Sequence, residues 1–130
     1  YMTKKEIING NKLIAEFMDW KQCKDGDWQW KHPKNSILPA QYEAYGTKYT
    51  YDENMKFNSS WEWLMPVVDK IESLHFNSHI VRKDGLHYCI FFHYLMIPGL
   101  RVESAHHNYK INAIYEATIK FIELYNTKKK

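Results

Sequence analysis

Residues 58–74, NSSWEWLMPVVDKIESL, constrain the fold more than any other part of the chain. Ser59 is followed three residues later by Glu62, a spacing typical of a capping box at the start of a helix. Pro66 interrupts this helix and predicts a kink, with a looser first turn over residues 60–65 as the alternative, because proline removes one backbone hydrogen bond. The large apolar residues recur at steps of three and four, which predicts one broad apolar stripe that other elements must bury: Trp61, Leu64, Met65, Val68, Ile71 and Leu74.

The sequence after this helix predicts a β-hairpin and a third strand. Asp84-Gly85 separates residues 78–83 from residues 86–96, and Asp-Gly between two apolar runs is a strong signal for a two-residue hairpin turn. Pro98-Gly99 marks the next reversal of the chain, so residues 100–105 are expected to form the third strand. Three antiparallel strands of this kind are a natural cover for the apolar stripe.

The middle strand is expected to be covered on both faces. The two-residue turn sets a register in which Lys83 lies opposite Leu86 and Val81 lies opposite Tyr88. Apolar side chains dominate both alternating sets of the middle strand, a pattern typical of a buried central strand. One set is Leu86, Tyr88, Ile90, Phe92 and Tyr94, and the other is His87, Cys89, Phe91, His93 and Leu95.

Two further amphipathic helices are expected near the ends of the chain. Thr3 and Glu6 form a second capping box that opens a helix to about Met18, and Asn108 caps a helix that runs to about Asn126. The resulting order is helix, aromatic insert, helix, three strands and helix. This is an α+β fold, a three-stranded antiparallel sheet packed by amphipathic helices. The length of 130 residues predicts a single domain.

An aromatic-rich insert, residues 19–56, separates the first helix from the second. Residues 28–32 and residues 49–51 alternate like two short strands. A long connection in a compact domain is usually functional or mobile. If the two strands lie side by side, four aromatic side chains form a wall suited to stacking a base or burying a partner's side chains: Trp28, Trp30, Tyr49 and Tyr51. The alternative is that these side chains close a satellite core over the first helix.

Composition and charge narrow the classes of function. The net charge is +3, the basic tail at residues 127–130 carries three lysines, and the only arginines are Arg82 and Arg101. This balance argues against a nucleic-acid-binding protein, which usually shows a basic stripe. No apolar run reaches the ~18 residues that cross a bilayer, and no signal-peptide pattern opens the chain, so no membrane partner is expected.

Neither a metal site nor a catalytic site is predicted. Cys23 and Cys89 fit no zinc motif and no disulfide framework, so both are expected as reduced thiols. Only His93, His106 and His107 can converge, which is one ligand short of a closed zinc site. The acidic residues of the turns lack the paired geometry of a general acid and base. No cofactor is expected, and an enzyme stays as an alternative whose site is not visible in the sequence.

A nucleic-acid-binding module is a further alternative. The order helix, three strands, helix is similar to double-stranded-RNA-binding domains, and Lys110 opens the last helix where such domains carry lysines. The residues after Lys110 do not continue a phosphate-binding cluster, and Arg82, Lys83 and the tail are too few for a footprint. Arg82 nevertheless joins the four aromatic residues of the wall as a candidate binding residue.

Three segments carry a family resemblance: residues 11–20 (NKLIAEFMDW), residues 57–72 (FNSSWEWLMPVVDKIE) and residues 110–126 (KINAIYEATIKFIELYN). They resemble a family of small uncharacterised proteins encoded by bacteriophages and prophages of gut Bacteroidetes, and SWEWLMPVV is the most specific string. The resemblance implies a phage accessory protein with an αβα-sandwich arrangement and no assigned activity. Tyr109 departs from the small Ser or Thr that the family often carries at that place.

Together, the resemblance and the missing catalytic motifs predict a small non-enzymatic phage accessory protein that acts by binding in the host cytoplasm. An inhibitor or sequestering module against host defence is favoured, with a host protein or a small nucleotide ligand as its partner. A homodimer is an additional hypothesis, since an exposed face of the middle strand or the aromatic patch would drive self-association.

Overall fold

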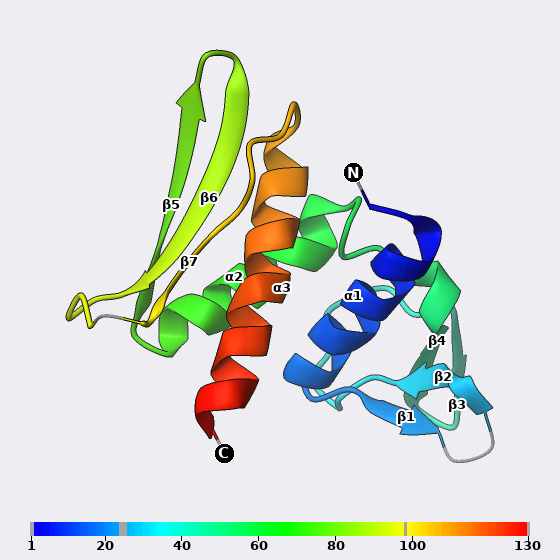
Figure 1. Ribbon diagram of the computed structural model, residues 1–130. Helices are drawn as coiled ribbons and strands as arrows, with labels where there is room; N and C mark the ends of the chain where they lie inside the picture. The colour runs from blue at the N-terminus through cyan, green and yellow to red at the C-terminus, as the bar shows by residue number, and fades with distance from the viewer. Residues whose placement is uncertain (1, 24–25, 98, 130) are drawn as a thin grey trace. The chain divides into compact units, whose positions relative to one another are not determined.

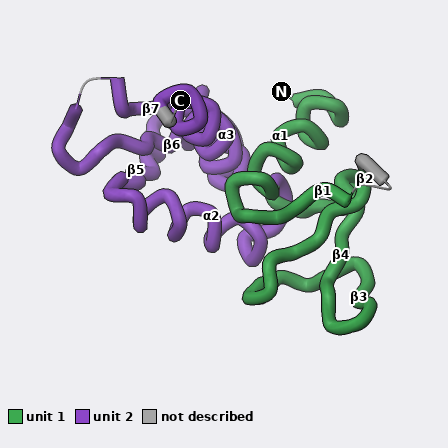
Figure 2. The backbone as a smooth tube through the Cα atoms, turned by 90° about the horizontal axis from the view of Figure 1, so that it is seen from below, with its two compact units in different colours: residues 1–57 green, residues 58–130 purple. Residues whose placement is uncertain are grey.

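The computed structural model describes residues 2–23, 26–97 and 99–129, and the chain divides into two compact units (Figures 1 and 2). Unit 1 is residues 1–57 and unit 2 is residues 58–130. The predicted α+β class is confirmed, and so is a three-stranded antiparallel sheet, which lies in unit 2. A second, four-stranded sheet in unit 1 was not predicted. The single domain expected from the length stays a prediction.

Unit 1 combines one long helix with the four-stranded antiparallel sheet, whose strand order is β1-β2-β4-β3. Its elements are α1 (Lys4–Phe17), β1 (Lys21–Cys23), β2 (Gly26–Lys31), β3 (Tyr42–Ala44), β4 (Thr47–Tyr51) and the 3-10 helix η1 (Asp52–Asn54). The predicted capping box is confirmed: the Thr3 hydroxyl accepts from the Glu6 N–H at 3.2 Å, and the Glu6 carboxylate accepts from the Thr3 N–H at 3.0 Å. Tyr45 and Gly46 have φ of 53° and 77°, so a two-residue turn joins β3 to β4.

The interior of unit 1 contains polar as well as apolar side chains. Trp30 of β2 and Thr50 of β4 lie directly opposite each other, and both are buried. The Asn11 side chain of α1 is also buried and donates a hydrogen bond to the carbonyl of Met55 at 3.1 Å. The apolar core residues of this unit are Ile14, Ala15, Phe17, Trp20, Trp30, Leu38, Met55 and Phe57.

Unit 2 contains the predicted hairpin, and its strand order is β5-β6-β7. Its elements are α2 (Trp61–Ser73), β5 (Phe76–Lys83), β6 (Leu86–His93), β7 (Arg101–Glu103) and α3 (Lys110–Lys129). Asp84 and Gly85 have φ of 54° and 80°, as a two-residue hairpin turn requires. The predicted register is confirmed, because Lys83 pairs with Leu86 and Val81 pairs with Tyr88.

The capping box predicted for α2 is wrong. The helix begins at Trp61, and its N-cap is Ser60, whose side chain makes no capping hydrogen bond. The helix therefore starts one residue later than the sequence suggested, and Glu62 falls on its second position instead of its third. A carboxylate at the second position lies outside the Ser-x-x-Glu geometry that closes the box. The helix continues through Pro66, and the predicted kink stays a prediction.

The expectation that β6 is covered on both faces is also wrong. Cys89 and Phe91 are buried on the side of the sheet where α3 packs. Tyr88, Ile90 and Phe92 project from the other face and are half-buried. Figure 1 shows α2 and α3 on the same side of this sheet. Neighbouring side chains on an open sheet shield one another, so an apolar set does not by itself require a covering layer.

Candidate binding face

One face of the unit 1 sheet carries a continuous row of side chains across all four strands. Lys21 of β1 lies opposite Lys31 of β2, Lys31 lies opposite Tyr49 of β4, and Tyr49 lies opposite Tyr42 of β3. Residues directly opposite in an antiparallel pair project to the same face, with Cβ atoms about 5 Å apart. Strands lie about 4.8 Å apart, so the row from β1 to β3 spans about 14 Å.

Four aromatic side chains form a cluster on this face, which we call the aromatic face: Trp28, Tyr42, Tyr49 and Tyr51. Tyr42 and Tyr49 stack with ring centroids 5.1 Å apart, and Tyr42 meets Tyr51 at 6.0 Å. The ring of Trp28 meets Tyr51 edge-on at 4.4 Å. Trp28 is 50% exposed and Tyr42 is 37% exposed, so the cluster presents aromatic surface to solvent.

Tyr42 is the residue of the aromatic face with a shifted pKa. Desolvation raises the pKa of Tyr42, and the neighbouring Tyr51, Tyr49 and Cys23 raise it further. The Tyr42 hydroxyl therefore stays protonated and keeps a hydrogen-bond donor beside the stacked rings.

The structure removes Trp30 from the predicted wall. Trp30 lies opposite Thr50 on the interior face of the sheet and is only 2% exposed. The prediction assumed that residues 28 and 30 share a face by strict alternation. The pairing of β1 with β2 shifts between Gln22 and Cys23: Gln22 lies opposite Trp30, whereas Cys23 lies opposite Gly26. Such a shift breaks the period of two, and Trp28 instead joins Tyr51.

Tyr42 and both lysines of the row were not predicted from the sequence. Tyr42 lies in the aromatic-rich insert but outside the two strands predicted there, although Tyr45-Gly46 carries the glycine that a two-residue turn favours. Only the pairing of β1 with β2 brings the two lysines opposite each other on this face. Arg82, the fifth predicted binding residue, is exposed on β5 of unit 2 and belongs to the other sheet.

Beneath the aromatic face, a hydrogen-bonded histidine supports β4. The ring of His32 stacks on Trp20 at 3.8 Å, and its two nitrogens are hydrogen-bonded to Ser36 Oγ at 3.0 Å and Thr50 Oγ1 at 2.7 Å. Burial, together with the positive charge of Lys48, lowers the pKa of His32 from 6.5 to about 4. His32 is therefore neutral at pH 7, and both ring nitrogens are occupied by structural contacts.

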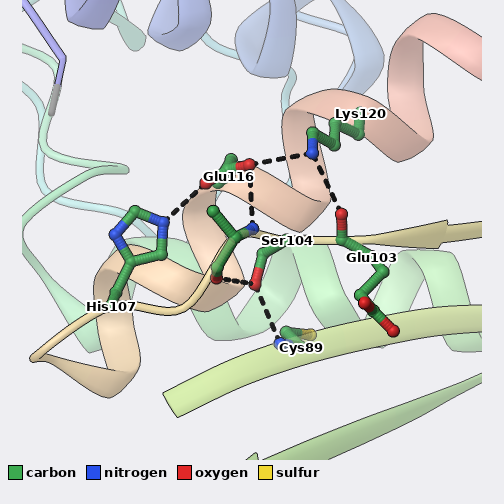
Figure 3. Close-up of polar contacts among 7 residues, drawn as sticks. Cys89, Glu103, Ser104, His107, Glu116 and Lys120 are labelled. Atoms are coloured by element: carbon green, nitrogen blue, oxygen red, sulfur yellow. Dashed lines mark hydrogen bonds and ion pairs between the residues drawn. The ribbon is translucent and has the colours of Figure 1, made fainter. Parts of the chain in front are cut away.

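Unit 2 has a polar network that joins the segment around β7 to α3 (Figure 3). The Glu116 carboxylate bonds to His107 Nε2, to Lys120 Nζ at 2.9 Å and to the Ala105 N–H at 3.1 Å. Lys120 Nζ also donates to the carbonyl of Glu103 at 3.0 Å. Burial alone would raise the pKa of Glu116, but the hydrogen bonds from His107, Lys120 and Ala105 outweigh it and lower that pKa.

The contacts of this network hold residues 104–107 against β6 and α3 and do not activate a nucleophile. The Ser104 hydroxyl donates to the carbonyl of Ala105 at 2.8 Å and accepts from the Cys89 N–H at 3.0 Å. Its contacts are thus with the backbone, whereas His107 is bonded to Glu116. Burial raises the pKa of the Cys89 thiol to about 12, so this sulfur carries no thiolate near neutral pH.

The three histidines considered for a metal have separate partners. His93 meets Phe76 at 5.2 Å, His106 stacks on Tyr88 at 4.7 Å, and His107 bonds to Glu116. Within the described parts of the chain, no group of three or more His, Cys, Asp or Glu side chains is arranged to hold a metal ion.

Unit 2 also exposes apolar surface. The four consecutive side chains Tyr94, Leu95, Met96 and Ile97 lie after β6 and are all exposed, and Tyr94 is 53% exposed. Tyr94 has ring contacts with His75 and His93.

Comparison with known proteins adds no relative: no family model, no curated protein and no solved structure matches the chain. Of the helices that the structure describes, none combines the length and the hydropathy needed to traverse a bilayer.

Proposed function

We propose that this chain is a non-enzymatic binding protein and that the aromatic face of unit 1 is its recognition surface. The observation that carries the proposal is the packing of a half-exposed tryptophan, Trp28, against Tyr51 on an open sheet face. Aromatic side chains supply large contact area at low entropic cost, and Trp and Tyr dominate the energetics of binding interfaces. Exposed aromatic rings that already pack on one another are preorganised for such a contact.

The chemistry of the buried groups supports binding over catalysis. Two groups with shifted pKa values are engaged in structural contacts: His32 with Ser36 and Thr50, and Glu116 with His107 and Lys120. A catalytic acid or base needs a proton-transfer partner in a substrate, whereas these groups are saturated by the protein.

The biological role follows from the resemblance in SWEWLMPVV and the two other segments. We propose a phage accessory protein that acts in the host cytoplasm as an inhibitor or sequestering module against host defence. The proposed partner classes are a host protein and a small nucleotide ligand. Both offer flat or apolar groups that an open aromatic face can bury.

The test is selective loss of binding after substitution on the aromatic face. The double variant Trp28→Ser/Tyr42→Ser is compared with Tyr94→Ser, which removes a similarly exposed aromatic side chain from unit 2. Immobilised chains are incubated with host lysate, and bound proteins, nucleic acids and small molecules are identified by mass spectrometry and sequencing. A partner retained by the natural chain and by Tyr94→Ser, but lost from the double variant, supports the proposal.

Two controls make the result decisive. The double variant has to keep the circular dichroism spectrum and the melting temperature of the natural chain within a few degrees, which shows that unit 1 is intact. Loss of the same partner from Tyr94→Ser with retention by Trp28→Ser/Tyr42→Ser contradicts the proposal and moves the recognition surface to unit 2.

A further inference from the structure

We infer that the aromatic face binds single-stranded nucleic acid, with bases stacked on its rings and phosphates held by Lys21 and Lys31. The inference rests on the proposed function, because it names the ligand class of the same surface. It is supported by three features of unit 1: the charge of the row, the geometry of the rings and the openness of the face.

The row carries two positive charges in direct opposition. Lys21 and Lys31 lie directly opposite each other, and like charges in that position destabilise a sheet. Among the described residues, neither lysine forms an ion pair. The described strand positions that share this face through pairing carry no carboxylate; Glu43 pairs with Lys48 on the other face. An anionic strand would neutralise the two lysines.

The rings lie in the same row as these positive charges. Lys31 is the direct neighbour of Tyr49, which stacks on Tyr42 with an interplanar angle of 17°. Trp28 stands beside Tyr51 with an interplanar angle of 80°, so the cluster offers rings in more than one orientation. Surfaces that bind single strands combine a cationic track with aromatic side chains on which successive bases stack.

The openness of the face favours a strand over a free nucleotide. One stacked base strengthens binding by only about 5- to 150-fold. A mononucleotide can make one such stacking contact. A strand that follows a row of about 14 Å can make several stacking contacts and two phosphate contacts. A duplex hides its base faces within the stack and is recognised by other means.

The kind of cationic residue in the row, lysine rather than arginine, also favours nucleic acid over a protein partner. The fully buried centres of protein interfaces are enriched in Tyr, Trp, Met and Arg and depleted of Lys. The row has the aromatic residues of such a centre, but its cations are Lys21 and Lys31.

The first experiment measures fluorescence anisotropy of labelled dT12, dA12 and rU12 with the full chain at 50 mM and 200 mM NaCl. Two phosphate contacts to a single strand predict that the logarithm of the association constant falls with the logarithm of the salt concentration with a slope near about −1.4. This corresponds to about a 7-fold loss of affinity between the two salt concentrations. Lys21→Ala/Lys31→Ala is expected to abolish most of this salt dependence. The matched control Lys5→Ala/Lys56→Ala removes two exposed lysines of unit 1 from outside the row and leaves the slope unchanged.

The second measurement reports on Trp28 itself. Trp61 is 42% exposed and the remaining three tryptophans are buried, so Trp61→Phe leaves Trp28 as the solvent-accessible fluorophore. In this background, dT12 is expected to quench the emission, and Trp28→Ala is expected to weaken binding of dT12 at least 5-fold.

Several outcomes overturn the inference. The first is the absence of binding to all three oligonucleotides at 50 mM NaCl. The second is binding whose affinity changes neither in Trp28→Ala nor in Lys21→Ala/Lys31→Ala. The third is competition by dTMP that is as effective as competition by dT12. The last outcome assigns the face to a free nucleotide. If no oligonucleotide binds while Trp28→Ser/Tyr42→Ser still loses a captured protein, the inference fails and the proposed function stands.

Discussion

The two sheets of this chain differ in how the charged side chains of their open faces are paired. In unit 2, Arg101 and Glu103 project from the open face and form an ion pair of 2.9 Å, and Lys83 lies on the same face opposite Leu86, at the hairpin turn. In unit 1, Lys21 and Lys31 lie opposite each other without a carboxylate on the described paired positions of the face. Apolar side chains on an open sheet face are common, so the two faces are distinguished by how their charged side chains are paired rather than by their apolar content.

The interiors of the units differ in a related way. Phe76, Phe91 and Phe121 meet ring to ring inside unit 2, at 4.8 and 5.9 Å. The interior of unit 1 instead holds His32 and Thr50 in a direct hydrogen bond. A buried imidazole makes the stability of unit 1 sensitive to mildly acidic pH, which an aromatic core does not share.

The largest expected effect separates two tryptophans of one strand. Trp30→Ala removes a buried indole and is expected to destabilise unit 1 by about 3–5 kcal/mol. Trp28→Ala removes a half-exposed ring and is expected to cost about 1 kcal/mol, from its edge contact with Tyr51. Urea unfolding followed by circular dichroism measures both. Equal losses for the two variants would show that Trp28 is a core residue and that the aromatic face is not a free surface.

The second prediction concerns pH and distinguishes the units. The unfolded chain takes up a proton at His32 near pH 6.5, whereas the folded chain does so only near pH 4, so stability falls as the pH drops from about 6.5 to about 4. The loss is at most about 3 kcal/mol, from 1.36 kcal/mol for each pKa unit. Glu116 in unit 2 has a lowered pKa, so its contribution is present above pH 4.5 and is lost at lower pH.

Urea unfolding between pH 7.5 and 3.5 measures these two contributions. His32→Gln is expected to flatten the pH dependence between pH 6.5 and 4.5, where Glu116 contributes no change. Glu116→Gln is expected to flatten it only below pH 4.5. An unchanged pH dependence in His32→Gln would show that His32 titrates alike in the folded and unfolded chains.

The smallest expected effect compares the first turns of two helices. Thr3 closes a capping box on α1, and Thr3→Ala is expected to cost about 1 kcal/mol. Ser60 precedes α2 without a side-chain capping bond, so Ser60→Ala is expected to change stability by no more than about 0.5 kcal/mol. Equal costs at the two positions would show that Ser60 caps α2 in solution.

Most of the sequence predictions that succeeded depend on residues close together in the sequence, and those that depend on the pairing of distant strands succeeded only in part. Three of the four residues predicted for the aromatic wall, Trp28, Tyr49 and Tyr51, lie together, whereas Trp30 is interior and Tyr42 was missed. The α2 capping box failed by one residue, because two adjacent serines offer two N-cap positions and the sequence does not choose between them. The proposed function rests on the resemblance and on the geometry of the aromatic face.

By itself, the sequence determined the features that neighbouring residues control. Thr3 with Glu6 was sufficient to place the start of α1, and Asp84-Gly85 was sufficient to place the β5–β6 turn and its register, because each involves residues at most a few positions apart. Only the tertiary structure decided which side of β2 each tryptophan occupies. That choice depends on the pairing of β2 with β1 and with the distant β4, and one shift in such a pairing moves a side chain from solvent to core.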